Sequence, residues 1–186
     1  MIITSKEKET LLNMAFHAIA KRIDPINPSP SPLGEELTET LESTCGAFVS
    51  VYVDQELRGC IGTFSEEKSL HTNVKKMAVS AAFEDNRYTA IRTEELPRLE
   101  IEISVLTPRQ RIYDPSEIVI GKHGIYIKHG AKRGTLLPQV AVKQNWDLLQ
   151  FLGSCSKYKA GIGWDGWKTA ELYTYEAIVF SSEISM

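Results

Sequence analysis

The chain has 186 residues, and at about 150 residues per domain this length predicts one domain. Its 42% hydrophobic content is enough to build a core, so disordered and collagen-like proteins are excluded. Its formal net charge of -3 argues against nucleic acid as the expected partner, and no apolar run approaches the length of a membrane-spanning helix. Cys45, Cys60 and Cys155 form no paired framework and the N-terminus lacks the apolar stretch of a signal peptide, so we expect a cytoplasmic protein without structural disulfides.

The first predicted element is a helix that ends near residue 23. Thr4 and Glu7 form a capping-box pattern, and apolar residues follow at helical spacing from Leu12 to Ile23. Prolines then alternate with small polar residues. The 24–34 segment is therefore predicted to be an extended, Pro-rich surface strap.

A hairpin, a second helix and a third strand are predicted next. The β-prone runs 48–53 and 57–63 are separated by three polar residues, which predicts a β-hairpin. From Leu70 to Ala81, apolar residues recur at the spacing of an amphipathic helix. Residues 99–106 alternate strictly, which predicts a strand with one core face and one polar face.

The C-terminal half is predicted to hold further strands around one short helix. Residues 124–129 and 135–142 are typical of strands, although Pro138 marks part of the second as an edge or a loop. A short helix is predicted from an Asn145 cap, and the last strand is predicted over 172–180. Local hairpins and irregularly spaced helices together predict an α+β fold, with an antiparallel-rich mixed sheet and flanking helices.

Charge is concentrated in one region. Residues 118–146 contain five Lys and Arg and no acidic residue. Two interpretations stay open. The region is either a solvated hairpin face balanced by neighbouring acids, or a landing site for an anionic molecule or for the acidic face of a partner.

The hexamer Leu-Arg-Gly-Cys-Ile-Gly at 57–62 is the most unusual in the chain, because two glycines flank a cysteine inside a predicted strand. Glycine within a strand indicates a bulge, a bend or a close backbone approach. Unbroken alternation would place Arg58 and Cys60 on one face, with their Cα atoms about 6–7 Å apart. The same alternation predicts that Leu57 and Ile61 project into the core.

This hexamer has a functional and a structural interpretation. A guanidinium near Cys60 would favour the thiolate and could hold an anion beside the sulfur. Gly59 and Gly62 would then leave backbone N–H groups open to that ligand. The alternative is that Cys60 is a small buried hydrophobic residue, which is the usual role of a free cysteine.

A thiol enzyme also needs groups that move protons. His123 is the best placed histidine, in a Gly-Lys-His-Gly sequence within the basic region, although a histidine between glycines is more often a turn residue. Glu102 lies on the polar face of the 99–106 strand. That face is either solvated or, inside a cleft, able to supply a proton shuttle.

Several familiar signatures are missing. The sequence has no Gly-rich phosphate loop, no G-x-S-x-G elbow and no H-E-x-x-H motif, and its histidines lack metal-ligand spacing. Neither a cofactor nor a metal is therefore predicted.

The octapeptide Leu-Arg-Gly-Cys-Ile-Gly-Thr-Phe at 57–64 resembles the hallmark of the AMMECR family. The resemblance continues in order through further segments, which are 96–108, 121–125, 136–141, Trp146, 151–152 and 159–161. Together they extend over about residues 6–180, so the chain is identified as a member of that family. One departure is Asp-Asn-Arg-Tyr at 85–88, where the family has Asp-Pro-Arg-Phe; the charges are kept and the rigid turn is lost.

The resemblance implies a single AMMECR-like domain over 1–186, with two unequal lobes and the hexamer near the cleft between them. It also implies an association with Memo-like and radical-SAM proteins, the AmmeMemoRadiSam system. It implies no particular reaction. The positions that match the family's motifs are Arg58, Cys60, Asp85, Arg87, Glu102, His123 and Gln139.

Two hypotheses follow. In the first, a polar cleft binds a small anionic molecule or modifies a partner, with Cys60 as nucleophile or ligand contact and Glu102 and His123 moving protons. The ligand-binding positions of that hypothesis are Arg58, Gly59, Gly62, Asp85, Arg87 and Gln139. In the second, the chain is a non-catalytic interaction module that docks a Memo-like or radical-SAM partner through the basic 118–146 region.

Overall fold

The computed structural model describes residues 1–25 and 37–182. The chain forms two compact units, each of which is described by itself: unit 1 comprises Met1–Leu106 and Ile178–Met186, and unit 2 comprises Thr107–Ala177. Most of the expected Pro-rich strap at 24–34 lies outside the described residues. No helix within the described ranges has both the length and the apolarity needed to cross a membrane.

Unit 1 is built on an antiparallel sheet. β1 (Ala47–Val53) lies between β2 (Glu56–Thr63) and β3 (Leu99–Leu106), and the last residues of β7 (Glu171–Ser181) follow β3 in the strand order. β2 is therefore an edge strand. The turn between β1 and β2 consists of Asp54 and Gln55, both with positive φ, as a two-residue type I′ hairpin requires.

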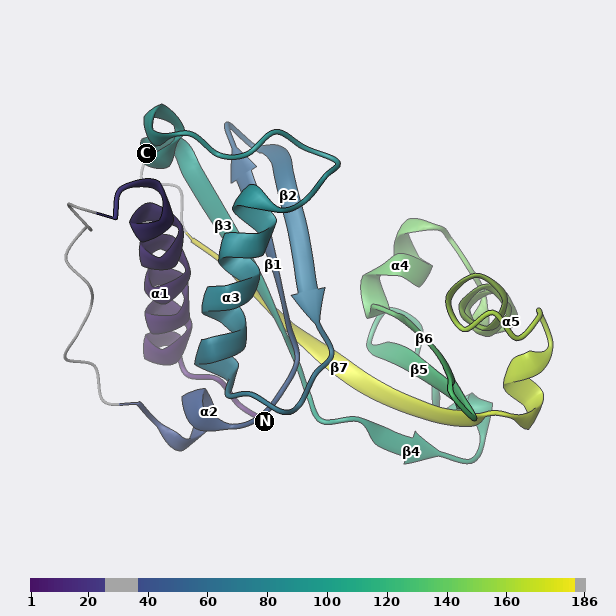
Figure 1. Ribbon diagram of the computed structural model, residues 1–186. Coiled ribbons are helices and arrows are strands. Elements are labelled where there is room, and N and C mark those ends of the chain that lie inside the picture. The colour runs from purple at the N-terminus through teal and green to yellow at the C-terminus, as the bar shows by residue number, and fades with distance from the viewer. Residues whose placement is uncertain (26–36, 183–186) are drawn as a thin grey trace. The chain divides into compact units, whose positions relative to one another are not determined.

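Two helices cover one face of this sheet. α1 (Ser5–Ile23) and α3 (Leu70–Phe83) lie side by side against it, as Figure 1 shows. The short α2 (Glu39–Glu42) and a 3-10 turn, η1 (Thr93–Arg98), complete unit 1. The predicted capping box of α1 is confirmed.

The core of unit 1 lies between these helices and the sheet. It is formed by side chains that are almost completely buried, among them Leu11, Ile19, Val49, Val51, Leu70, Val74, Ile101 and Ile103. The alternation that predicted the 99–106 strand is confirmed, because the residues of its apolar face belong to this core.

A β-bulge interrupts the predicted hexamer strand. Val51 pairs with Gly59 whereas Tyr52 pairs with Leu57, so Arg58 is an extra residue without a partner on β1. Ile61 packs against the core as predicted. The prediction that Leu57 also enters the core is wrong, because the extra residue shifts the alternation and places Leu57 opposite Tyr52 on the other face.

Unit 2 is also an antiparallel sheet with helices on one face. The first part of β7 is flanked by β4 (Gln110–Ile112) and β5 (His123–His129), and β6 (Lys132–Leu136) pairs with β5. The remaining elements of unit 2 are η2 (Pro115–Glu117), α4 (Pro138–Lys143), α5 (Leu148–Ser154), the π-helical turn η3 (Cys155–Lys159) and η4 (Gly166–Thr169). Its core includes Ile125, Ile127, Phe151, Leu152 and Cys155.

Two predictions in unit 2 are wrong in detail. The strand expected over 135–142 ends at Leu136, and Pro138 begins α4 instead, because a proline without an N–H is well suited to the first position of a helix. The helix expected from Asn145 begins after Asp147, whose side chain accepts a hydrogen bond from the Gln150 N–H. The α+β class, with its antiparallel sheet and flanking helices, is confirmed.

Candidate functional site

A polar row crosses the sheet of unit 1 on the face opposite α1 and α3. Ser50 pairs with Cys60 on one side and with Glu102 on the other, so thiol, hydroxyl and carboxylate stand on three adjacent strands. Directly opposed residues in antiparallel strands have Cα atoms about 4.5–5.5 Å apart. Ser50 is buried, while Cys60 and Glu102 are half-buried. We call Cys60, Ser50 and Glu102 the thiol row.

Tyr52 extends this row. It lies two residues after Ser50 on the same face of β1. Burial raises the pKa of the Tyr52 phenol, and the neighbouring Glu102 carboxylate and the Cys60 sulfur raise it further, whereas the Ser50 hydroxyl lowers it. The phenol is therefore a hydrogen-bond donor at neutral pH, close to a carboxylate and a thiol.

The main chain of Cys60 is held on its outer side by two charged side chains. The Cys60 N–H donates to Asp85 Oδ2 (2.9 Å), and the Cys60 carbonyl accepts from Arg87 Nη2 (3.0 Å). Because β2 is an edge strand, these groups would otherwise face away from the sheet. The Asp85–Arg87 pair thus takes the place of a further strand at this one residue.

Asp85 and Arg87 also bind each other. Arg87 Nε donates to Asp85 Oδ1 (2.8 Å) and Arg87 Nη2 to Asp85 Oδ2 (2.6 Å), a bidentate arrangement. The guanidinium holds the pKa of the Asp85 carboxyl well below its usual range, and the carboxylate raises the pKa of Arg87. The Asp85 side chain is 4% exposed and that of Arg87 is 62% exposed, so the guanidinium presents a cation to solvent beside Cys60.

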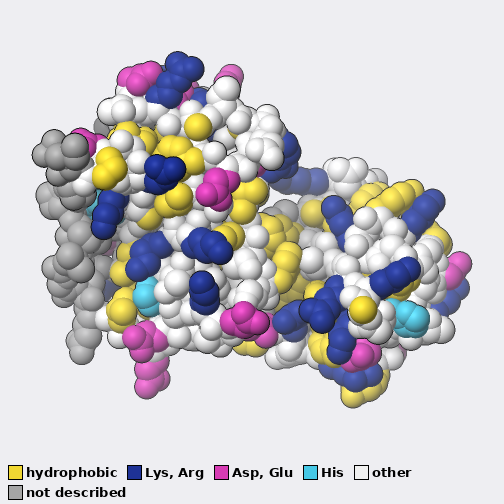
Figure 2. All heavy atoms as spheres, viewed as in Figure 1, with side chains coloured by type: hydrophobic (Ala, Val, Ile, Leu, Met, Phe, Trp, Pro, Cys, Tyr) yellow, Lys and Arg dark blue, Asp and Glu magenta, His cyan; other side chains and the backbone are white. Residues whose placement is uncertain are grey.

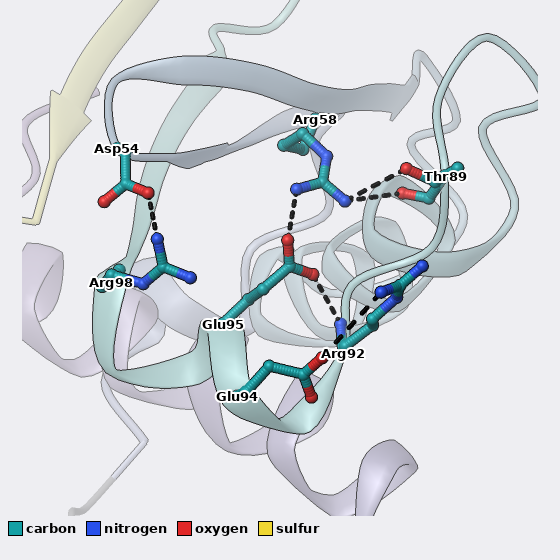
Figure 3. A network of polar contacts seen from close by, with 7 residues as sticks. All are labelled: Asp54, Arg58, Thr89, Arg92, Glu94, Glu95 and Arg98. Atoms are coloured by element: carbon teal, nitrogen blue, oxygen red, sulfur yellow. Dashed lines mark hydrogen bonds and ion pairs between the residues drawn. The ribbon is translucent and has the colours of Figure 1, made fainter.

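Arg58 is held by a separate network, which Figure 3 shows. Its Nη1 donates to Glu95 Oε1 (2.5 Å), and its Nη2 donates to the carbonyl and hydroxyl oxygens of Thr89 (both 3.2 Å). Glu95 also accepts the N–H of Arg92, and the Arg58 guanidinium is the main cause that lowers the pKa of Glu95. The Arg58 and Glu95 side chains are only 19% and 14% exposed, so the pair fastens the bulge of β2 to η1.

The two glycines of the hexamer each have a packing role. A Cβ atom at Gly59 would lie 1.9 Å from the carbonyl oxygen of Ala81, so α3 approaches β2 at a distance that only glycine allows. A Cβ atom at Gly62 would lie 2.2 Å from the ring of Phe48, which covers this position from the neighbouring strand. Both glycines are thus explained by contacts within unit 1.

The remaining predicted site residues belong to unit 2. His123 is half-buried at the start of β5, where its Nδ1 accepts the N–H of Val119 (3.1 Å) and its Nε2 lies 4.0 Å from Glu176 Oε1. A neutral His123 therefore carries its proton on Nε2. Gln139 is half-buried in α4.

The structure thus brings seven predicted positions together in unit 1, which are Arg58, Gly59, Cys60, Gly62, Asp85, Arg87 and Glu102. The prediction that Arg58 and Cys60 share a face assumed unbroken alternation, which the bulge interrupts. Sequence reasoning missed Ser50 and Tyr52. Alternation within β1 would have placed these two residues on one face, but a hairpin register without the bulge would pair Ser50 with Gly59 rather than with Cys60.

Among residues 1–25 and 37–182, no group of three or more His, Cys, Asp or Glu side chains is arranged to hold a metal ion. The thiol row itself presents a thiol, a hydroxyl and a carboxylate, and Tyr52 beside it adds a second hydroxyl.

Comparison with known proteins gives a consistent result. The family model described as AMMECR1 matches residues 12–180. The chain is 38% identical over 193 residues to Protein MK0488 of Methanopyrus kandleri, with 97% of this chain and 91% of that protein covered. It is 39% identical over 158 residues to Protein NEQ441 of Nanoarchaeum equitans, with coverage of 80% and 87%.

A solved structure has the same fold. The crystal structure of uncharacterized protein PH0010 from Pyrococcus horikoshii matches with a TM-score of 0.80 and 30% sequence identity, covering 97% of this chain and 94% of that one. The names of these relatives state no activity.

Proposed function

The chain belongs to the AMMECR1 family, and from this premise we propose that the thiol row of unit 1 binds a small anionic molecule beside Cys60. The observation that carries the proposal is the geometry around Cys60. Its backbone is fixed on the outer side by Asp85 and Arg87, while its side chain lies in a row with Ser50 and Glu102. A fixed, half-buried thiol between a cation and a carboxylate is suited to contacting a ligand rather than only filling space.

The charges around the thiol row define the kind of ligand. The exposed guanidinium of Arg87 can bind the anionic end of the molecule. At the other end, Glu102 and the Ser50 hydroxyl can accept hydrogen bonds from donor groups of the ligand. The proposed ligand is therefore anionic at one end and carries hydrogen-bond donors at the other.

Arg58 has a positioning role in this proposal. Both terminal nitrogens of its guanidinium already donate to Glu95 and Thr89, so the residue stabilises the bulge that sets the direction of Cys60. The anion is assigned to Arg87 because that guanidinium is the exposed one of the two.

Thiol labelling tests the proposal without a known ligand. Cys45 and Cys155 are 1% and 0% exposed, so a thiol reagent added to the folded protein should report on Cys60, and Cys60→Ser should abolish the fast reaction. We expect phosphate, pyrophosphate or citrate to slow the labelling of Cys60. Arg87→Gln should remove this protection, whereas Arg92→Gln, at an arginine 70% exposed in the same unit, should keep it.

Two outcomes would contradict the proposal. One is that none of the three anions changes the labelling rate of Cys60. The other is equal protection in the Arg87→Gln and Arg92→Gln variants, which would show that the anions act by general screening.

A second candidate function is supported by the packing around the hexamer. Gly59 and Gly62 are explained by Ala81 and Phe48, and Arg58 by its ion pair, so the motif can be needed for backbone geometry alone. The chain would then be a non-catalytic module that docks a Memo-like or radical-SAM partner through the basic 118–146 region.

The charged residues of that region differ in their contacts. Lys122 and Lys128 pair with Glu176 and Glu171, and Lys132 donates to a backbone carbonyl. Arg133 is exposed at the end of the hairpin. Charge reversal at Lys132 and Arg133 should weaken binding of a purified Memo-like partner if this function holds, and should leave it unchanged if the thiol row is the only functional site.

A further inference from the structure

Unit 2 has a sheet face that the function proposed for the thiol row does not use, and its Lys128 and Arg133 also belong to the basic 118–146 region. The side chains of Ile125, Ile127 and Leu172 lie on the buried face of the sheet, where they pack with residues of α5 and η3 in the core. Because side chains alternate along a strand, the intervening residues point to the opposite face. That face carries two rows across the sheet, Arg111–Tyr173–Tyr126–Thr135 and Glu171–Lys128–Arg133.

Aromatic rings and arginines contact one another on this face. The rings of Tyr126 and Tyr173 meet edge to face, with centroids 5.8 Å apart. The guanidinium of Arg109 lies over the Tyr126 ring at 4.5 Å from its centroid, and that of Arg111 lies 5.2 Å from the centroid of Tyr113, which is 84% exposed. We call Arg109, Arg111, Tyr126, Lys128, Arg133 and Tyr173 the Tyr–Arg face.

Cations dominate the charge of the Tyr–Arg face. Within the two rows Glu171 is the single carboxylate, and it accepts from the Tyr173 hydroxyl (2.7 Å) and pairs with Arg111 (3.3 Å) and Lys128 (3.6 Å). Figure 2 shows Lys and Arg side chains gathered over the region where Figure 1 places β4. Two of the three cations in the rows, Arg111 and Lys128, thus share one acidic partner.

The charge of the whole chain conceals this surface. Unit 2 contains ten Lys and Arg against six Asp and Glu, whereas unit 1 contains eleven against eighteen. The net charge of -3 is therefore the sum of an acidic unit and a basic unit. A net negative charge of the whole chain therefore does not exclude a nucleic-acid partner for unit 2 taken by itself.

We propose that the Tyr–Arg face of unit 2 binds single-stranded nucleic acid. Backbone phosphates would lie against Arg111, Lys128 and Arg133, and bases would stack on Tyr173 and on the Arg109 guanidinium above Tyr126. An acidic protein, as the alternative partner, would need only the cations of this face for binding. The rings beside them favour a ligand that carries flat aromatic groups together with its negative charges, and unpaired bases are available only in single strands.

Salt dependence of binding measures the phosphate contacts directly. Fluorescence anisotropy of the full chain with labelled oligo(U) and oligo(dT) of about 15 nucleotides should show binding at low salt. With three phosphates neutralised, the slope of log affinity against log salt should be about -2, and Arg111→Ala should make it shallower by about 0.7. Lys143→Ala is the matched control, because this exposed lysine lies on α4 and outside the Tyr–Arg face.

Stacking is tested at Tyr173. Tyr173→Ala should weaken binding roughly 5- to 100-fold, as loss of a base–aromatic stack does. Tyr173→Phe keeps the ring and removes only the hydroxyl that donates to Glu171, so it should retain most of the affinity. If the alanine variant fails to fold, the salt slope of Arg111→Ala still decides the proposal.

The following results would overturn the inference. The first is that the oligonucleotides do not bind at low salt. The second is that Arg111→Ala and Lys143→Ala change the salt slope equally. The third is that the chain binds a duplex as tightly as a single strand. Displacement by polyglutamate together with no effect of Tyr173→Ala would also overturn it and would assign the face to an acidic protein. Neither the Cys60 labelling nor its protection by anions depends on these results.

Discussion

The two units use the same construction with different charges. Each has an antiparallel sheet with helices on one face and polar side chains on the other. In unit 1, each arginine near the hexamer has a carboxylate of its own, Arg58 that of Glu95 and Arg87 that of Asp85. In unit 2, two cations of one face, Arg111 and Lys128, share Glu171. A cation near a candidate site therefore indicates anion binding only once its own partners are known.

The largest expected effects come from one glycine in each unit. Gly59 lies under the backbone of α3, and a Cβ atom at Gly134 would lie 2.4 Å from the Ala160 nitrogen at the end of η3. Because a backbone cannot move aside as a side chain can, Gly59→Ala should lower the free energy of unfolding by about 3 kcal/mol and Gly134→Ala by about 2 kcal/mol. Chemical denaturation measures the loss, and hydrogen exchange assigns it to a unit.

Gly62→Ala is the control for this prediction. Its Cβ atom would meet the ring of Phe48, a side chain that can turn away, so the loss should be smaller than at Gly59. Equal losses at Gly59 and Gly62 would show that the close approach of α3 is not what requires glycine in β2.

The next effect concerns the ion pair that holds the bulge. Glu95→Ala leaves the mostly buried Arg58 guanidinium with only the Thr89 oxygens, so it should lower the free energy of unfolding by about 2 kcal/mol. Glu171→Ala removes the shared carboxylate of the Tyr–Arg face, where the side chains are more exposed, and should cost less. The comparison between the units fails if Glu171→Ala is the more destabilising variant in the same denaturation assay.

Acid should weaken unit 1 through Glu7. The Thr38 hydroxyl (2.5 Å) and the Thr4 N–H bind the Glu7 carboxylate and lower its pKa from 4.5 to about 2. A carboxyl whose pKa is lower in the folded state than in the unfolded state stabilises the fold fully at a pH above its unfolded-state pKa. This stabilisation is lost as the pH falls through the folded-state pKa. On the order of 2 kcal/mol should therefore be lost between about pH 5 and about pH 2.

A difference measurement isolates this group from other carboxylates. Glu7→Gln keeps the capping geometry of α1 but does not titrate, so its unfolding free energy should fall less steeply over the same pH range. Identical pH profiles for the variant and the original chain would exclude Glu7 as a source of acid sensitivity.

The parts of the fold that the sequence predicted are those with strong periodicity. α1, α3 and β3 each repeat apolar residues at the period of their element, and this period directly reflects one buried face. The bulge at Arg58 has no such signal, because it depends on partners 31 and 37 residues away in the chain. Pro138 was ambiguous, since proline is compatible both with a strand edge and with the first turn of a helix.

The candidate site was predictable to a similar extent. The hexamer identified Cys60 and its glycines, but the roles of Gly59 and Gly62 follow from Ala81 and Phe48, which approach them only in the folded chain. The Tyr–Arg face was not predicted, because its residues come from three separate strands and its charge is cancelled in the total for the chain.

The smallest expected effect is at the tip of the first hairpin. Arg98 and Asp54 form an ion pair beside the network of Arg58 and Glu95, as Figure 3 shows, and their side chains are 51% and 59% exposed. Solvent screens such a pair, so Arg98→Ala should change the free energy of unfolding by no more than about 0.5 kcal/mol. A loss equal to that of Glu95→Ala would mean that the Arg98–Asp54 pair and the buried Arg58–Glu95 pair act as one unit, and a double-mutant cycle between Arg98 and Glu95 would then measure that coupling.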